Sequence, residues 1–402
     1  MSRVHVIEMS AGEREEALSI CKALSSSFRA AGPKYDEENA FPFELAEEFR
    51  TSGLANLTVP KKFGGWGADI GTFAECTQIL AEGDAACALA FNMHLAVVGF
   101  FRGMWSEQSQ QKYFSKVSSN AALFDGAYSE SRAGVIGIAD TLAKPVDGGY
   151  LINGKKTWGT LSLVADIHTF NACITDESGN LPEDPAIREQ REVMFACPAS
   201  AKGVRIDKTW DALGMRATGT ETVIFEDVFV PKDDLVSPAF RPGLFLNLEW
   251  QTLSFASVYL GLARRAYQES LQILKTKNLG MISGAANVAL KDMQRVQSGL
   301  GEMRVLIETA ESLIGQTCER LNNNEQIPDA PPERLAWLEI PKIVATENAI
   351  KVVDIGMRLV GGGSYRRGHI LERLYRDARS GPFHPLTTDQ TLELLGQVAL
   401  SE

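Results

Sequence analysis

Apolar residues recur with helical spacing through the first part of the chain. The first stretch shows this most clearly, with Leu18, Cys21, Leu24 and Phe28 three or four positions apart. Residues at this spacing share one face of a helix, and glycines stand where such stretches end. The predicted helices are 12–31, 41–53, 73–80, 87–104 and 107–117, with a glycine-rich loop at 61–67. The chain is therefore expected to open as a helical block.

Short β-rich runs replace this pattern between residues 123 and 235. The runs at 150–152, 193–195 and 222–225 are separated by Asp-Gly and Asn-Gly turns, which is typical of a small β domain. Long helical patterns then return, at 245–278, 286–322, 334–360 and 387–400. We expect an α+β, mostly α protein with helical residues 1–122, a β domain at 123–238 and helical residues 239–402. A cofactor cleft is expected where the β module meets the helices.

Composition narrows the class of protein. The 402 residues are 45% hydrophobic, which is enough for several domains that share a core. A net charge of −11 argues against a nucleic-acid surface, and no apolar run approaches the roughly 20 residues that cross a bilayer. The six cysteines form no CxxC pair and no metal-ligand spacing, so we expect a reducing, cytoplasmic location and no metal site. No GxGxxG follows a strand, so a Rossmann nucleotide site is not expected.

Motifs spread over nearly the whole chain carry a family resemblance. The longest is Leu-Gly-Met-Arg-Ala-Thr-Gly-Thr-Glu-Thr-Val at 213–223, followed by Phe-Glu-Asp-Val-Phe-Val-Pro at 225–231. Shorter ones agree in register at 63–67, 152–158, 361–363 and 375–377. With these motifs the chain resembles the acyl-CoA dehydrogenase superfamily. The resemblance implies an N-terminal helical domain, a barrel-like middle β domain and a C-terminal four-helix bundle, assembled as a homotetramer with flavin between the β domain and the bundle.

The resemblance also implies which residues hold the flavin. Tyr128, Ser129, Trp158 and Thr160 correspond to residues that line the isoalloxazine ring. A neighbouring subunit is expected to contribute Lys277, Arg358, Gly361, Gly362 and Gly363. The arginine that the family usually places here falls on Thr276, so the pyrophosphate charge must be met by other basic residues. This departure leaves both FAD and FMN open as the cofactor.

The carboxylate base of an acyl-CoA dehydrogenase is missing from its usual place. That enzyme removes an α proton while a hydride passes to the flavin, so a glutamate must face the ring. The family's usual position is held by Pro385, and the alternative position on the first long bundle helix is held by Gln251. Glu249 lies two positions away, which is about 200° around a helix. A dehydrogenase that uses Glu249 or a histidine as its base stays as the alternative function.

Two of the five histidines fall where the superfamily's flavin-dependent monooxygenases need them. His384 stands one residue before the lost glutamate, and His94 is on a helix expected to face the ring. With Thr160, the resemblance places these histidines around the flavin C4a and N5 atoms. Such two-component enzymes take reduced flavin from a separate reductase and react with O2 through a C4a-hydroperoxyflavin, which needs hydrogen-bonding groups in a pocket that excludes water. Imidazole suits this role because it donates or shuttles a proton near neutral pH.

The favoured reading is therefore a flavin-dependent monooxygenase with catalytic candidates His94, Thr160, His384 and Glu249. For such a monooxygenase the resemblance implies a small aromatic or organosulfur substrate. The candidate pocket residues are mostly apolar, which fits a small aromatic, an alkyl sulfur compound or a short acyl chain equally well. These residues are Phe91, Leu95, Phe245, Leu248, Phe255 and Phe383. A paralogue without catalysis is disfavoured, since Trp158, Thr160 and the glycine turn are present.

Overall fold

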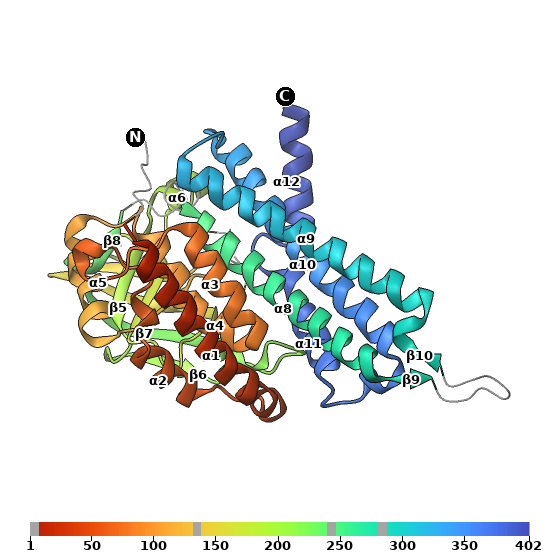
Figure 1. The fold of residues 1–402 in the computed structure, drawn as a ribbon. Helices are drawn as coiled ribbons and strands as arrows, with labels where there is room; N and C mark the ends of the chain where they lie inside the picture. The colour runs from red at the N-terminus through yellow and green to blue at the C-terminus, as the bar shows by residue number, and fades with distance from the viewer. Residues whose placement is uncertain (1–7, 132–137, 239–246, 280–287, 402) are drawn as a thin grey trace.

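The computed structural model describes residues 8–131, 138–238, 247–279 and 288–401 (Figure 1). Its N-terminal third is helical. The helices are α1 (Ala11–Glu38), α2 (Phe43–Thr51), α3 (Ile70–Gly83), α4 (Ala85–Phe101) and α5 (Glu107–Asn120). Helix α1 begins at a capping box, in which Ser10 Oγ accepts the Glu13 N–H and Glu13 accepts the Ser10 N–H. Its buried face carries the apolar residues that predicted it, which confirms the helical opening of the chain.

Helix α1 continues past the predicted end at Ala31, through Gly32 and Pro33, to Glu38. The prediction took Gly32 for a helix stop. A Cβ atom added at Gly32 would lie 2.1 Å from an Asp84 carboxylate oxygen and 2.8 Å from an Arg373 nitrogen. This glycine is therefore required by close packing against a buried ion pair, and it leaves the helix intact.

The middle of the chain forms one eight-stranded sheet in the order β6-β7-β3-β2-β4-β5-β8, with β1 paired to β4. The strands are β1 (Phe124–Ala127), β2 (Leu142–Val146), β3 (Gly149–Gly159), β4 (Ile167–Ile174), β5 (Glu192–Pro198), β6 (Val204–Asp207), β7 (Glu221–Pro231) and β8 (Leu235–Ser237). Most pairs are antiparallel, while β4 runs parallel to both β1 and β2. A short helix, α6 (Pro185–Gln190), lies between β4 and β5.

Long helices make up the C-terminal third, together with a small β9 (Asn278–Leu279) and β10 (Val288–Ala289) hairpin. They are α8 (Glu249–Thr276), α9 (Gln294–Asn323), α10 (Pro331–Val360), α11 (Ile370–Ala378) and α12 (Thr388–Ser401). In Figure 1, α8, α9 and α10 lie side by side, and α12 starts against α10 and projects from the bundle at the end of the chain. The α, β, α order and the mostly helical class are thus confirmed. The domain limits at 122 and 238 stay a prediction.

One continuous hydrophobic core joins the N-terminal and C-terminal helices, because α8 packs on α3 and α4 as well as on α10. The sheet has a second core of its own. All six cysteines are buried and free. None of the helices in the described ranges combines the length and apolar character needed to cross a bilayer. The described side chains also include no group of three or more His, Cys, Asp or Glu arranged to hold a metal ion.

Candidate active site

A cavity of about 650 Å³ lies where the sheet meets the two helical blocks. Helix α4 contributes Leu89, Met93 and Val97 to its walls, α8 contributes Leu248, Gln251 and Phe255, and α10 contributes Leu335 and Glu339. The end of β1 with residues 128–130, the end of β3, residues 210–220 and residues 376–390 contribute the rest of the lining. Most of the lining surface is apolar, so the cavity suits a ligand with flat or aliphatic surface and few polar groups.

Trp158 lines this cavity and has an unusually exposed side chain. It is 60% exposed and meets Trp210 edge to face at 5.4 Å between ring centroids. Its backbone has a φ of 63°, and Leu161 three residues on has a φ of 73°. A bulky residue in the left-handed region is strained, and strain of this kind concentrates at ligand sites. The segment therefore holds an exposed aromatic face beside the cavity.

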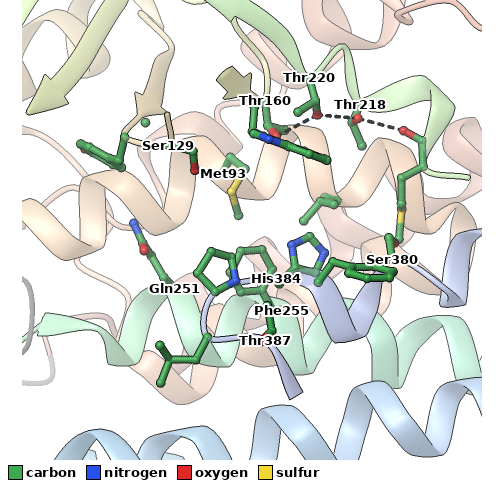
Figure 2. A pocket seen from close by; sticks show the side chains of 18 of the residues that line it. Met93, Ser129, Thr160, Thr218, Thr220, Gln251, Phe255, Ser380, His384 and Thr387 are labelled. Atoms are coloured by element: carbon green, nitrogen blue, oxygen red, sulfur yellow. Dashed lines mark hydrogen bonds between the residues drawn. The ribbon is translucent and has the colours of Figure 1, made fainter. Parts of the chain in front are cut away.

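A chain of three hydroxyls begins at Thr160 in the cavity wall (Figure 2). Thr160 Oγ1 lies 2.9 Å from Thr220 Oγ1, which lies 2.7 Å from Thr218 Oγ1. Thr218 Oγ1 in turn donates to the Met215 carbonyl oxygen at 2.8 Å. A carbonyl only accepts and each hydroxyl has one hydrogen, so Thr220 donates to Thr218 and Thr160 donates to Thr220. Thr160 therefore presents a lone pair to the cavity.

His384 lies on the opposite side of the open centre in Figure 2, stacked on Phe255. The two ring centroids are 4.1 Å apart with 16° between the planes. Nε2 of His384 lies 2.8 Å from the Tyr259 hydroxyl, which lies 2.6 Å from Ser380 Oγ. Burial, followed by the charge of Lys342, lowers the pKa of His384 to about 3. The imidazole is therefore neutral at physiological pH.

A buried ion pair holds the backbone around His384. Lys342 pairs with Glu339 one turn earlier on α10 and donates to the carbonyl oxygens of His384 and Leu386. Burial lowers the pKa of Lys342, and the Glu339 carboxylate opposes this shift. Glu339 also accepts the hydroxyls of Thr252 at 3.3 Å and Thr391 at 3.1 Å. The segment after α11 is thus fixed against α10.

His94 lies away from the cavity, although its neighbour Met93 lines it. The His94 side chain is fully buried, with Nε2 2.9 Å from the Ala55 carbonyl oxygen. Its Nδ1 accepts the Phe124 backbone N–H at 3.0 Å. Burial lowers the pKa of His94 to about 4, so the ring is neutral and both nitrogens are used by backbone groups. The geometry does not bring His94 to the expected flavin, and it gives this histidine a place in the N-terminal core.

Glu249 and Gln251 face different ways from the start of α8. Gln251 lines the cavity and offers a neutral amide. Glu249 is 1% exposed, lies outside the cavity lining and pairs with Arg334 at 3.4 Å. The predicted rotation between the two positions matches this arrangement. Glu249 is thus not placed to act as a base in this cavity.

Two carboxylates do line the cavity, and both are paired with buried lysines. Glu339 pairs with Lys342, as described above. Glu130 accepts Lys156 Nζ at 2.7 Å and the Thr141 hydroxyl at 2.6 Å. Burial lowers the pKa of Lys156, which Glu130 counteracts. The three internal segments outside the described residues, 132–137, 239–246 and 280–287, contain no Asp or Glu. Among the described residues, therefore, no unpaired carboxylate faces the cavity.

Four of the expected flavin residues meet in this cavity: Tyr128, Ser129, Trp158 and Thr160 line it together. The Tyr128 hydroxyl is 2.8 Å from Thr169 Oγ1, and burial raises its pKa. Among the apolar candidates, Leu248, Phe255 and Phe383 line the cavity, whereas Phe91 and Leu95 belong to the helical core. Phe245 lies outside the described residues.

The remaining cofactor candidates gather at a separate surface. Arg358, Gly361 and Gly362 line a shallow depression at the end of α10, and Gly363 belongs to the same turn. Lys277 donates to the Val360 carbonyl oxygen at 2.6 Å, which caps that helix. Arg376 borders both this depression and the cavity. The separation within one chain is what a contribution to a neighbouring subunit's flavin would require.

Several residues of the site were not foreseen from the sequence: Thr218, Thr220, Tyr259 and Ser380. Thr218 and Thr220 stand inside the longest family motif, but no chemical role was given to them. Tyr259 follows Phe255 by one helical turn, as Phe255 follows Gln251. This spacing places all three on one face of α8 and is the signal that would have found Tyr259.

Comparison with known proteins identifies related families and folds. Models of the N-terminal, middle and C-terminal domains of acyl-CoA dehydrogenase match residues 20–121, 127–228 and 253–388. A putative acyl-CoA dehydrogenase, YdbM of Bacillus subtilis (strain 168), is 28% identical over 94% of both chains. Dibenzothiophene monooxygenase of Rhodococcus qingshengii is 24% identical over 92% of this chain and 89% of its own.

A solved structure has a similar fold over nearly its whole length. FMN-bound TdsC from Paenibacillus sp. A11-2 superposes with a TM-score of 0.85 over 96% of this chain and 97% of its own. The two sequences are 24% identical.

Proposed function

The chain belongs to the acyl-CoA dehydrogenase superfamily of flavin-dependent oxidoreductases, and we propose that within it this protein is a monooxygenase that uses reduced flavin and O2 to oxygenate a small aromatic or organosulfur substrate. The observation that carries the proposal is the absence of an unpaired carboxylate among the described residues of the cavity. α,β-Desaturation of an acyl thioester needs a base to take the α proton. Oxygenation makes no such demand.

The residues present fit a flavin ring. Trp158 offers an exposed aromatic face, and Ser129 and Tyr128 line the same wall. Thr160 presents an oxygen lone pair, which suits a ring nitrogen that carries hydrogen. Reduced flavin, when bound, would supply the two electrons that convert one atom of O2 to water while the other enters the substrate. FMN and FAD both stay within the proposal, as do a separate reductase, a homotetramer and a cytoplasmic location.

The chain's own residues give this chemistry its setting. The apolar residues of α4, α8 and α10 keep water from the reacting atoms, which protects a reactive oxygen species from decay. Neutral His384 and the amide of Gln251 are polar groups available to orient a substrate against these walls. Dibenzothiophene monooxygenase, a relative along nearly the whole chain, supports a neutral aromatic compound as the substrate class.

The proposal is tested by following isotopically labelled O2 into product. Purified protein, FMN, an NADH-dependent flavin reductase and a panel that includes dibenzothiophene and indole are mixed under the labelled gas. We expect one labelled oxygen atom in the product, and His384→Gln is expected to release hydrogen peroxide in its place. If no substrate is labelled, and butyryl-CoA bleaches the oxidised flavin without O2, the protein is a dehydrogenase instead.

A further inference from the structure

We infer that this cavity selects substrates that carry an N–H or O–H group, and that Nδ1 of His384 accepts that hydrogen. The inference rests on the proposed function and narrows its substrate class. It follows from the direction of a hydrogen-bond chain, which begins on α11 and ends at the imidazole.

The direction is set at the Asp377 carbonyl oxygen, which only accepts. Ser380 Oγ donates to it at 2.6 Å, so the single hydrogen of this hydroxyl is used there. The 2.6 Å contact between Ser380 and Tyr259 then needs the Tyr259 hydrogen. Tyr259 has no second hydrogen for His384, so the 2.8 Å contact to Nε2 requires a proton on Nε2. In the neutral ring, the lone pair is left on Nδ1.

The neighbours of His384 keep the ring in this state. The ammonium group of Lys342 lies 3.4 Å from the His384 carbonyl oxygen, and its charge opposes a second proton on the imidazole. Stacking on Phe255 fixes the plane of the ring. Nδ1 has no hydrogen-bond partner among the described residues, and it is not one of the buried polar atoms left unpaired, so it is open to the cavity.

A substrate without a hydrogen-bond donor would leave the lone pair of His384 Nδ1 without a partner. When a ligand displaces water, an acceptor that loses its partner carries the full desolvation penalty. The charged residues Glu130, Glu339 and Arg376 are already paired within the protein, and Arg379 is exposed where it borders the cavity. Most of the remaining lining surface is apolar. The matching ligand is therefore an uncharged aromatic compound with one donor, such as an indole, a phenol or an arylamine.

Three ring compounds of nearly equal shape separate this idea from simple apolar binding. Indole has an N–H, whereas N-methylindole and 1-benzothiophene have none. We would measure their affinities by calorimetry with the full-length protein saturated with oxidised FMN, which permits no turnover. Indole is expected to bind about tenfold more tightly than either analogue. Burial of apolar area alone predicts the opposite order, since both analogues are more apolar than indole.

A variant that reverses the chain gives the sharper test. In Ser380→Ala, Tyr259 loses its acceptor and turns its hydrogen toward Nε2, which moves the imidazole proton to Nδ1. The cavity then offers a donor, so indole should lose its advantage and benzothiazole, whose ring nitrogen accepts, should gain about tenfold. Ser257→Ala is the matched control, because Ser257 lies on α8 near Tyr259, outside the cavity lining, with a buried hydroxyl that has no partner.

The proton can also be located directly by ¹⁵N NMR of the labelled histidines, with His384 identified by its loss in His384→Gln. A proton on Nε2 in the wild type that moves to Nδ1 in Ser380→Ala supports the inference. A proton on Nδ1 in the wild type, or equal affinities for indole and 1-benzothiophene, overturns it. Because none of these measurements needs turnover, failure to oxygenate any substrate would count against the proposed function alone.

Discussion

Met215 donates its backbone N–H to the buried carboxylate of Asp377 at 2.6 Å, across 162 positions of the chain. The two residues join both walls of the cavity. The Met215 carbonyl ends the hydroxyl chain from Thr160, and the Asp377 carbonyl ends the chain from His384. One contact between the 212–220 segment and α11 therefore supports both Thr160 and His384.

Asp377 should make the stability of the protein depend on pH. Burial, together with the charge of Asp84, raises its pKa from 3.8 to about 7. Between these values the folded state holds a proton that the unfolded chain has released, so this group adds stability as the pH falls from about 7 to about 4. Asp377→Asn imitates the protonated form at every pH. The melting temperature of the wild type should thus rise relative to that of the variant as the pH falls from 8 to 5. A difference that stays constant over this range would contradict the prediction.

The hydroxyl chain should set the redox preference of the bound flavin. Reduced flavin has an N–H at N5 that the oxidised ring lacks, and Thr160 offers it a lone pair. In Thr220→Val, the Thr160 hydrogen is free to donate to oxidised flavin, so the ratio of reduced to oxidised affinity should fall about tenfold. For a two-electron couple this lowers the midpoint potential of bound FMN by about 30 mV.

Thr222→Val is the control for this potential, and Thr220→Ser should restore the wild-type value. Thr222 lies two residues further on, in β7, and its hydroxyl pairs with that of Thr209 at 2.9 Å outside the cavity lining. Equal potentials for Thr220→Val and the wild type would remove the role given to the chain. Thr218→Val carries the same test if Thr220→Val binds no flavin.

The two histidines should separate into a structural and a functional residue. His94→Leu leaves the Ala55 carbonyl and the Phe124 N–H without partners in the core, so it should lower the free energy of unfolding by about 2–5 kcal/mol. His384→Gln, at a partly exposed site, should change it by less than about 1 kcal/mol. Urea denaturation measures both. A stable His94→Leu protein with altered flavin potential would return His94 to the list of catalytic candidates.

Lys342 should contribute to stability mainly by neutralising the buried carboxylate of Glu339. Lys342→Met leaves the Glu339 carboxylate buried without a cation, which should cost about 3–5 kcal/mol in urea denaturation. Adding Glu339→Gln removes that charge and should recover most of the loss. A double variant no more stable than Lys342→Met would show that the pair is not energetically coupled.

The sequence was sufficient for the helices, because a helix with one buried face repeats its apolar residues every three or four positions. It also identified Gln251 and Pro385, which both line the cavity, because they stand at positions that a motif identifies. It was not sufficient for Gly32, since the same glycine signals a helix end and a close contact. The sequence also did not predict which atoms of Tyr259 and His384 carry the protons. Tyr259 and His384 are 125 positions apart, and the direction of their hydrogen bond depends on a carbonyl that no local pattern connects to them.

The pairing of every charged carboxylate in the cavity has a consequence for ionic strength. Glu130 and Glu339 are neutralised at contact distance by buried lysines, and a neutral ligand brings no charge whose attraction dissolved salt could screen. The affinity for a neutral aromatic ligand should thus be nearly flat from low to high salt. The Arg358 side chain at the end of α10 is 68% exposed, so its charge is open to screening by salt. The affinity of this surface for a flavin phosphate should therefore fall as the salt concentration rises.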